Sequence, residues 1–178
     1  LLMKINKGRR VSIQKNHTST HLLQFALKKI LGNHIEQRGS MLTEDIFRFD
    51  FSHQSKLSDK ELNDVEELVK GLIKDEIKCV EDREANYDDA INAGAIGLFS
   101  EKYGDVVRTI KFGESYELCG GTHVGNTKEI EDFKIISEGS QAFGIRRITA
   151  SSNKTRIKEE QLKDQAIKEK AESEKANK

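Results

Sequence analysis

Asn16-His-Thr-Ser-Thr-His-Leu-Leu-Gln-Phe-Ala-Leu-Lys-Lys-Ile-Leu31 is the most informative stretch for the architecture, because it reads as one largely buried helix. Asn16 suits the N-cap position, and Gly32 suits the stop signal after the last turn. Between them an apolar stripe recurs at helical spacing, formed by Leu22, Leu23, Phe25, Ala26, Leu27, Ile30 and Leu31. We therefore predict a helix over residues 16–31, with His17 and His21 in its first turns.

Further elements are predicted downstream of this helix. Residues 46–51 alternate with period two, which predicts a strand with its three phenylalanines on one face. Ser58-Asp-Lys-Glu61 is a capping box that begins a long amphipathic helix with the apolar residues Leu62, Val65, Leu68, Val69, Leu72, Ile73 and Ile77. A short helix is predicted over 87–93, ended by Gly94, and strands over 106–112, 116–118, 132–137 and 144–150. Helices early and strands late favour the α+β class, a two-layer fold with helices packed on an antiparallel sheet.

The two ends of the chain differ from its middle. Residues 1–15 alternate loosely and read as the tail of a strand, the end of a truncated upstream segment, since the chain starts with Leu1. Residues 16–150 form the main domain. Residues 151–178 are rich in charges of both signs and carry only a thin apolar stripe, which predicts a charged helical linker or tail after a boundary near Ser151.

The composition limits the partners and the compartment. The 30 basic and 30 acidic residues give a formal net charge of zero, so a nucleic-acid partner must meet a local basic patch. Candidate basic residues are Lys7, Arg9, Arg10, Lys15, Arg146 and Arg147. The two cysteines are distant in the sequence, no apolar run is long enough to span a bilayer, and the N-terminus lacks a signal-peptide pattern, so we expect a cytoplasmic protein without a membrane partner.

Two short pieces carry most of the chemistry. His17-Thr-Ser-Thr-His21 and Cys119-Gly-Gly-Thr-His123 each place two soft ligands four residues apart. On a helix, positions i and i+4 lie on one face, roughly 6 Å apart, so His17 and His21 can point at one ion. Three imidazoles and one thiolate make a tetrahedral zinc set, or three ligands with a held-back fourth and room for water. The plainer alternative is a capping histidine, a buried histidine and a chance Cys-His pair.

Gly120 and Gly121 stand between the second pair of ligands. Glycine permits backbone angles denied to other residues, so the chain can turn sharply around an ion or a ligand. Bare glycines also allow a substrate's backbone or sugar to approach closely. Cys79 has no histidine at ligand spacing and is most simply a small apolar core residue.

Six motifs in order then resemble a known family. They are Asn16-His-Thr-Ser-Thr-His-Leu-Leu23, Glu36-Gln-Arg-Gly-Ser40, Arg48-Phe-Asp-Phe-Ser-His53, Phe99-Ser-Glu-Lys-Tyr-Gly104, Glu117-Leu-Cys-Gly-Gly-Thr-His-Val124 and Gly144-Ile-Arg-Arg-Ile148. Together they resemble the editing domain of alanyl-tRNA synthetases, which also occurs in threonyl-tRNA synthetases and as free-standing proteins that clear mischarged tRNA. The resemblance covers about residues 5–150.

The resemblance implies hydrolysis of the ester that links serine or glycine to alanine-specific tRNA. In this family the residues matching His17, His21, Cys119 and His123 form the metal site, with Zn²⁺ as the implied cofactor, and those matching Gln37, Thr20 and Ser40 shape the pocket. We expect Cys119, His21 and Gln37 to take part in catalysis, and Gln37, Thr20 and Thr122 to lie near the serine hydroxyl.

The resemblance also implies partners. These are tRNA(Ala) mischarged with serine or glycine and the rest of a parent synthetase, whose aminoacylation domain, with its ATP and Mg²⁺, is absent here. Two alternatives stay open: a free-standing trans-editing or threonyl-type editing domain, and a structural zinc module that positions tRNA without chemistry. We read His34 and His53, which fall inside the motifs but off the metal pattern, as structural.

Overall fold

The computed structural model describes residues 4–97 and 103–176. Its helices are α1 (Lys7–Leu31), α2 (Asp59–Lys74), α3 (Tyr87–Asn92) and α4 (Lys154–Ala176), with a 3₁₀ helix, η2 (Thr127–Ile130). Its strands are β1 (Gln37–Leu42), β2 (Phe47–Ser52), β3 (Val80–Asn86), β4 (Val106–Phe112), β5 (Ser115–Leu118), β6 (Lys134–Ala142) and β7 (Ile145–Ser151). The predicted α+β class is confirmed.

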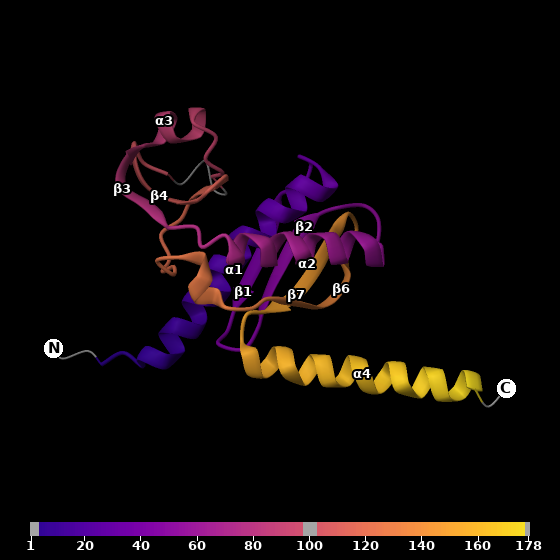
Figure 1. The fold of residues 1–178 in the computed structure, drawn as a ribbon. Helices are drawn as coiled ribbons and strands as arrows, with labels where there is room; N and C mark the ends of the chain where they lie inside the picture. Colours follow the sequence, from indigo (N-terminus) through magenta and orange to yellow (C-terminus); the bar gives the residue numbers. More distant parts are fainter. Residues whose placement is uncertain (1–3, 98–102, 177–178) are drawn as a thin grey trace.

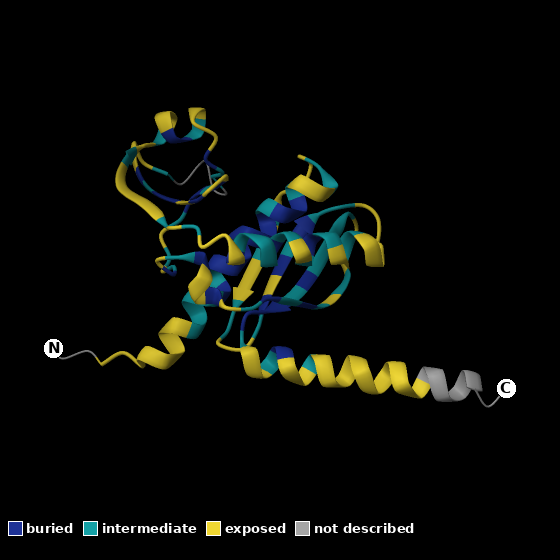
Figure 2. Ribbon diagram, viewed as in Figure 1, coloured by how far each residue is buried: buried dark blue, intermediate teal, exposed yellow. Residues whose placement is uncertain are grey.

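The strands form two antiparallel sheets. One has the order β1-β2-β7-β6, and the other has the order β3-β4-β5. Helices α1 and α2 pack together over one face of the larger sheet, while the smaller sheet and α3 stand to one side (Figure 1). Buried residues gather where the two helices meet the larger sheet, which places the main core there (Figure 2).

The alternation of β2 builds this core. Phe47, Phe49 and Phe51 are fully buried, whereas Arg48 between them is exposed. In an antiparallel sheet with one covered face, alternate side chains point to the core and to solvent. The strand predicted over 46–51 is therefore confirmed, with one phenylalanine face turned toward the helices.

Helix α1 begins earlier than predicted. Its N-cap is Asn6, whose side chain accepts a hydrogen bond from the backbone N–H of Arg9, so the predicted strand in residues 1–15 and the predicted cap at Asn16 are both wrong. Asn16 is instead buried in mid-helix, where its side chain bonds the carbonyl of Thr43 and the N–H and hydroxyl of Ser152. Adding helical turns to an existing helix needs no new nucleus, which favours a continuous helix over an unpaired strand.

The other helices largely follow the sequence pattern. The capping box of Ser58 and Glu61 begins α2, which ends at Lys74, so Ile77 lies beyond the helix while still packing on the core. Helix α3 lies where a short helix was predicted. Strands β1 and β3 were not predicted, because both are edge strands with few apolar residues. Of the motif over 99–104, residues 99–102 lie outside the described part of the chain.

The smaller sheet brings a loop back onto α1. Its own cluster of buried residues contains Ala90, Ala95, Val107 and Leu118. After Leu118 ends β5, the chain passes through residues 119–126 into η2, which packs on α1 and α2. The loop over residues 119–126 is thus held between the two units of the fold.

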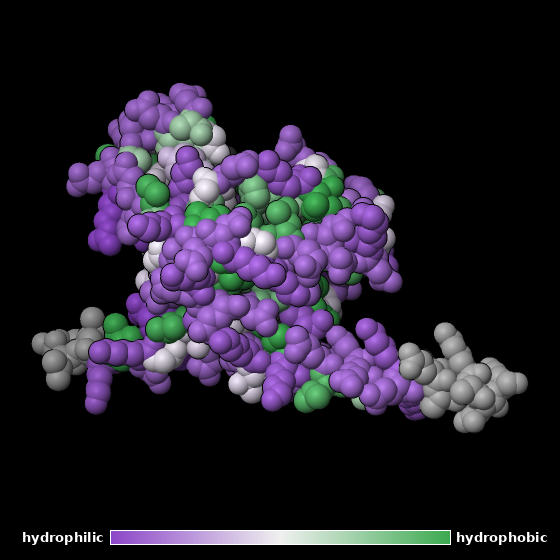
Figure 3. All heavy atoms as spheres, viewed as in Figure 1, coloured by the Kyte–Doolittle hydropathy of each residue, from purple (hydrophilic) through white to green (hydrophobic). Residues whose placement is uncertain are grey.

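Helix α4 extends away from the body of the molecule (Figure 1). Ile157 in its first turns is 2% exposed, whereas Leu162 and Ile167 are 59% and 67% exposed. The surface of this helix is mostly hydrophilic in the view shown (Figure 3). Within residues 4–97 and 103–176, no helix combines the length and apolar character needed to cross a membrane.

Candidate metal centre

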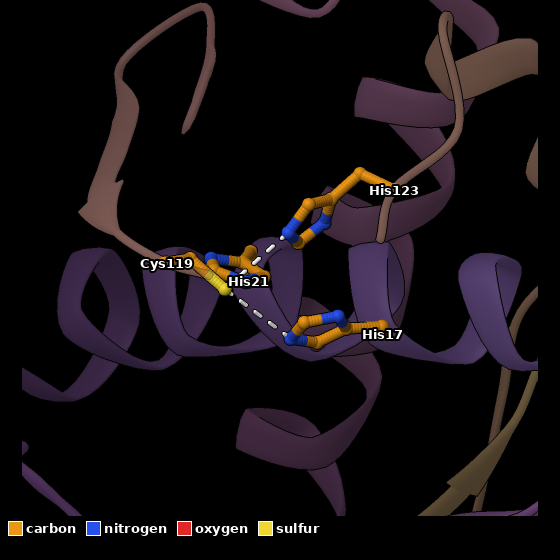
Figure 4. Close-up of side chains that lie close together, drawn as sticks. All are labelled: His17, His21, Cys119 and His123. Atoms are coloured by element: carbon orange, nitrogen blue, oxygen red, sulfur yellow. Dashed lines mark hydrogen bonds between the residues drawn. The ribbon is translucent and has the colours of Figure 1, made fainter. Parts of the chain in front are cut away.

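His17, His21, Cys119 and His123 meet in space, although they come from two distant parts of the chain (Figure 4). The two histidines of α1 lie one turn apart, and the other two residues belong to the loop after β5. Their ligand atoms all lie within 4.8 Å of one another. The Sγ of Cys119 is 3.5 Å from Nε2 of His17 and 3.3 Å from Nε2 of His123.

Each imidazole has its second nitrogen next to an oxygen atom. Nδ1 of His17 lies 3.2 Å from the carbonyl oxygen of Thr122, and Nδ1 of His123 lies 3.5 Å from the hydroxyl oxygen of Thr18. Nδ1 of His21 lies 2.8 Å from a carboxylate oxygen of Glu117. Oxygen partners on the outer nitrogen fix the tautomer and the ring orientation of histidines that bind metals. The Nε2 atoms are therefore left to face the centre of the cluster.

Glu117 is a site residue that sequence reasoning missed. Its side chain is 5% exposed, and the side chain of His21 beside it is 6% exposed. A signal was present in the sequence, because residues two apart on an extended chain point to the same side. Glu117 and Cys119 are such a pair, so a buried acid beside this cluster could have been anticipated.

The charges in the cluster are strongly coupled. Burial favours the neutral thiol of Cys119, but hydrogen bonds from His123, His17 and His21 outweigh burial and lower its pKa to about 3. Burial also lowers the pKa of His21, yet the carboxylate of Glu117 and the sulfur of Cys119 raise it to about 10. Burial lowers the pKa of His123 to about 4. In the metal-free cluster a thiolate therefore lies beside a neutral His123 and a protonated His21. A metal ion that binds here must displace the proton from Nε2 of His21, because only a neutral imidazole is a ligand.

The donor atoms, and the two nitrogen–sulfur distances around Cys119, are compatible with ligands of a tetrahedral metal ion. Ligand atoms of such a site lie about 3.3–3.8 Å apart when the bonds to zinc are about 2.0–2.3 Å long. Both nitrogen–sulfur distances around Cys119 fall in that range. The cluster is the one group of this kind found among the described residues, and three imidazoles with one thiolate are ligands that zinc accepts.

Arg108 and Gly121 shape the loop that carries Cys119. The guanidinium of Arg108 donates to the carbonyl oxygens of Cys119 and Gly121 at 2.8 and 2.5 Å, and it is held in turn by Glu81. A methyl group added to Gly121 would overlap the ring of His17, whereas one added to Gly120 would meet nothing within 4 Å. Neither glycine has a positive φ, so the expectation of unusual backbone angles here is wrong. Glycine is required at position 121 because a larger side chain would collide with the ring of His17.

A cavity of about 360 Å³ adjoins the cluster. Its lining combines the cluster with several of the predicted pocket residues: His17, Thr20, His21, Gln37, Ser40, Tyr103, Glu117, Leu118, Cys119 and Gly120. Gly121 and Thr122 are not among the residues that line it, and Thr122 is exposed, with only its carbonyl oxygen turned to His17.

Gln37 reaches the cavity from the first position of β1. It begins β1, where the pairing with β2 is shifted between Gln37 and Gly39. Its Nε2 lies 3.4 Å from the hydroxyl of Ser40, a long hydrogen bond. The amide is therefore only weakly engaged by the protein around it.

The remaining candidates lie away from the cluster. His34 and His53 form a separate pair, with 2.9 Å between Nε2 and Nδ1. Arg146 and Arg147, predicted as part of a basic patch, instead form ion pairs with Glu138 and Asp50. These two arginines therefore hold the larger sheet together across neighbouring strands.

Comparisons with known proteins support the resemblance seen in the motifs. Residues 107–149 match the family model "Threonyl and Alanyl tRNA synthetase second additional domain". The chain is 51% identical over 159 residues to an alanine–tRNA ligase of Christiangramia forsetii, a match that covers 88% of this chain and 18% of the relative. It is 53% identical over 147 residues to the alanine–tRNA ligase of Flavobacterium psychrophilum, covering 83% and 17%.

A third relative agrees with these two. The chain is 50% identical over 151 residues to the alanine–tRNA ligase of Thermotoga maritima, covering 84% of this chain and 17% of that protein. The chain therefore spans less than a fifth of the length of the relatives that it matches. Similarity at about half of all aligned positions, spread over most of the chain, confirms the resemblance to the alanyl-tRNA synthetase domain.

Proposed function

We propose that this chain is an editing domain of an alanine–tRNA ligase, and that it hydrolyses the ester joining serine or glycine to tRNA(Ala). The observation that carries the proposal is the convergence of His17, His21, Cys119 and His123 beside a cavity that also contains Gln37. The similarity of most of the chain to alanine–tRNA ligases supports this particular tRNA.

An alanine–tRNA ligase needs a hydrolytic site in addition to its aminoacylation site, because a pocket that selects alanine rejects serine poorly. A hydroxyl gained or a methyl group lost changes binding by only about 1–3 kcal/mol. The hydrolytic site must therefore prefer the substrate with the hydroxyl. Gln37 suits that task, because a neutral amide both donates and accepts hydrogen bonds and this one is weakly engaged. Ser40 and Thr20 line the same cavity and complete its polar wall.

The cluster supplies the ligands for zinc. When bound, zinc would act as a Lewis acid on the ester carbonyl, hold the amino group of the amino acid, or bring the pKa of a water molecule to about 7. Cys119 contributes the thiolate, and Glu117 holds His21 with Nε2 turned inward. Arg108 fixes the loop, which keeps Cys119 in place. Since the ester is already activated, positioning of water and substrate accounts for most of the required rate.

The chemistry breaks one bond and forms another. Water attacks the carbonyl carbon of the aminoacyl ester, the bond to the ribose oxygen breaks, and that oxygen takes a proton. Free amino acid and uncharged tRNA result. ATP and Mg²⁺ have no part in this step and belong, in this proposal, to a separate aminoacylation domain of the parent enzyme.

The direct test is to incubate the chain with tRNA(Ala) charged with serine, glycine or alanine and to follow release of the free amino acid. We expect serine and glycine to be released faster than by spontaneous hydrolysis, and alanine to remain on the tRNA. A chain that binds zinc and tRNA but releases no amino acid would instead be a structural module, as expected if all four protein ligands close the tetrahedron.

A further inference from the structure

Helix α1 carries an unusual concentration of positive charge. Its 25 residues include six lysines and arginines and no aspartate or glutamate, although the whole chain has 30 basic and 30 acidic residues. Lys7, Arg9 and Arg10 lie in its first turn, where no acidic residue accompanies them. The positive end of the helix dipole lies at this turn, so basic side chains there lower the stability of the helix. A bound anion would remove this penalty.

The basic residues in the first half of α1 divide into two groups. Nε of Arg9 lies 3.7 Å from a carboxylate oxygen of Glu44, and Lys15 has an acidic partner as well. Lys7 and Arg10 are exposed, and their side chains form no ion pair or hydrogen bond with any residue in the ranges 4–97 and 103–176. Their charges are therefore available to a partner from outside the chain.

These two available charges lie on the face of α1 that carries the metal-ligand candidates. Residues 7, 10, 17 and 21 follow one another at spacings of three, seven and four, which are one, two and one turns of a helix. With a rise of about 1.5 Å per residue, Arg10 is about 10 Å and Lys7 about 15 Å along the axis from His17. The first turns of α1 extend from the body of the molecule and are exposed (Figures 1 and 2). We call residues 7–11 the basic arm.

The charge and position of the basic arm match those of a nucleic-acid backbone. Arginine and lysine side chains supply most of the attraction of proteins for nucleic-acid phosphates, and an arginine can donate two parallel hydrogen bonds to one phosphate. The formal net charge of the chain is zero, so RNA can be attracted only by a local patch of this kind. An ester hydrolysed at the cluster lies at the 3′ end of an RNA strand, which brings the last phosphates of that strand close to α1.

We infer that Lys7 and Arg10 bind the sugar–phosphate backbone of the RNA strand that ends at the cluster, so that the basic arm holds the RNA outside the cavity. This inference rests on the proposed function, because that function brings an RNA to the cluster. Contacts to phosphates fix the position of a nucleic acid without reading its sequence. Lys7 and Arg10 are therefore RNA-binding residues that do not touch the reacting ester.

The salt dependence of RNA binding to the 178-residue chain tests this inference. The probe is uncharged tRNA(Ala), and its affinity is measured between about 50 and 200 mM salt. Lys7→Gln and Arg10→Gln should each reduce the slope of log affinity against log salt concentration by about 0.7–0.9, the contribution of one phosphate contact. The double variant should bind roughly tenfold more weakly at the lowest salt concentration. Arg9→Gln, the same change of charge at a neighbouring position that already has an acidic partner, is the control and should keep the wild-type slope.

Stability and a conservative variant give further readouts. Because Lys7 opposes the helix dipole, Lys7→Gln should melt at or above the wild-type temperature while binding RNA more weakly. Arg10→Lys keeps the charge and should keep most of the slope. Wild-type slopes in both glutamine variants would overturn the inference. So would binding of polyglutamate as tightly as tRNA with the same loss in the variants, since the basic arm would then be a surface for acidic proteins.

The outcomes separate this inference from the proposed function. Binding of uncharged tRNA requires no hydrolysis, so a slope that depends on Lys7 and Arg10 in a chain that releases no serine would leave the RNA surface standing and remove the editing activity. In an active chain, the double variant should raise KM for serine-charged tRNA and keep kcat within about twofold of the wild type. Serine release with an unchanged KM, together with an unchanged slope, would remove the RNA surface and leave the editing activity.

Discussion

Among the residues that line the cavity at the cluster, Gln37 has an amide that is only weakly hydrogen-bonded to the protein. The one hydrogen bond that its amide makes with the described residues, to Ser40, is long at 3.4 Å. We predict that Gln37→Leu slows serine release roughly ten- to hundredfold, because the loss of one hydrogen bond in a buried site costs about 1–3 kcal/mol. Single-turnover release of serine measures the effect, and zinc content measured on the same samples should not change, since a neutral amide is a poor zinc ligand beside imidazole and thiolate.

Gln37→His gives a sharper version of the same experiment. Histidine is ionisable and larger in cross-section, so it should also disturb serine release without changing the zinc content. Gln14→Leu serves as the control on α1. Serine release at the wild-type rate in the leucine variant would return Gln37 to a purely structural role.

The two cysteines should differ in reactivity with pH. Burial raises the pKa of Cys79 above its ordinary value of 9.0, whereas the imidazoles around Cys119 lower the pKa of that thiol to about 3. Between pH 5 and about pH 8 Cys119 is therefore a thiolate and Cys79 a thiol, and only the thiolate is nucleophilic. In the zinc-free chain at pH 6, iodoacetamide should modify Cys119 first, and peptide mapping would show it.

Added zinc should protect Cys119 from this modification. Lowering the pH toward 3 should slow the modification, because protonation of the thiolate removes the nucleophile. Equal labelling of both cysteines at pH 6 would contradict the charge distribution described for the cluster.

At the level of elements, the loop between β5 and η2 depends on one glycine. A side chain at Gly121 would occupy the space of the His17 ring, whereas Gly120 has open space around it. We predict that Gly121→Ala lowers zinc affinity at least tenfold, because His17 must move out of the ligand set, and that Gly120→Ala leaves the affinity unchanged. Competition with a chromogenic chelator measures both variants, and similar affinities for the two would show that the loop adjusts freely.

The elements that sequence predicted are those with apolar periodicity. The local sequence pattern indicates the secondary structure in three places: the buried part of α1, the capping box of α2 and the phenylalanine alternation of β2. Strand β3 has the sequence Val-Glu-Asp-Arg-Glu-Ala-Asn and is almost wholly exposed, so its pairing with β4 comes from tertiary context. The early turns of α1 were missed because Val11 and Ile13 alternate with polar residues as in a strand.

The same distinction applies to the site. The four residues of the cluster could be singled out because both pairs have a recognisable spacing within a short segment. Their convergence depends on the fold, since His17 and Cys119 are 102 positions apart. Three further residues support the cluster through contacts that sequence spacing does not predict: Thr18, Glu117 and Arg108. Only the alternation of Glu117 with Cys119 offered a clue.

At the scale of the whole molecule, α4 is joined to the body through its first turns. Ile157 is buried, while Ile167 is 67% exposed. We predict that Ile157→Ala lowers the free energy of unfolding by about 2–4 kcal/mol, as for other buried isoleucines, and that Ile167→Ala changes it by less than about 0.5 kcal/mol. Urea denaturation followed by circular dichroism measures both, and equal losses would mean that the far turns of α4 are also packed.

The candidate metal centre depends on the whole molecule, because the larger unit supplies His17 and His21 and the loop after the smaller sheet supplies Cys119. We propose that this cluster acts in clearing mischarged tRNA, and the second cysteine, Cys79, which packs beside the core, provides a matched control. The decisive measurement is the rate of serine release from serine-charged tRNA(Ala) by Cys119→Ala and Cys79→Ala side by side. We predict that Cys79→Ala keeps a rate close to that of the wild type and that Cys119→Ala falls to the spontaneous rate. Serine release by Cys119→Ala at the wild-type rate would contradict the account.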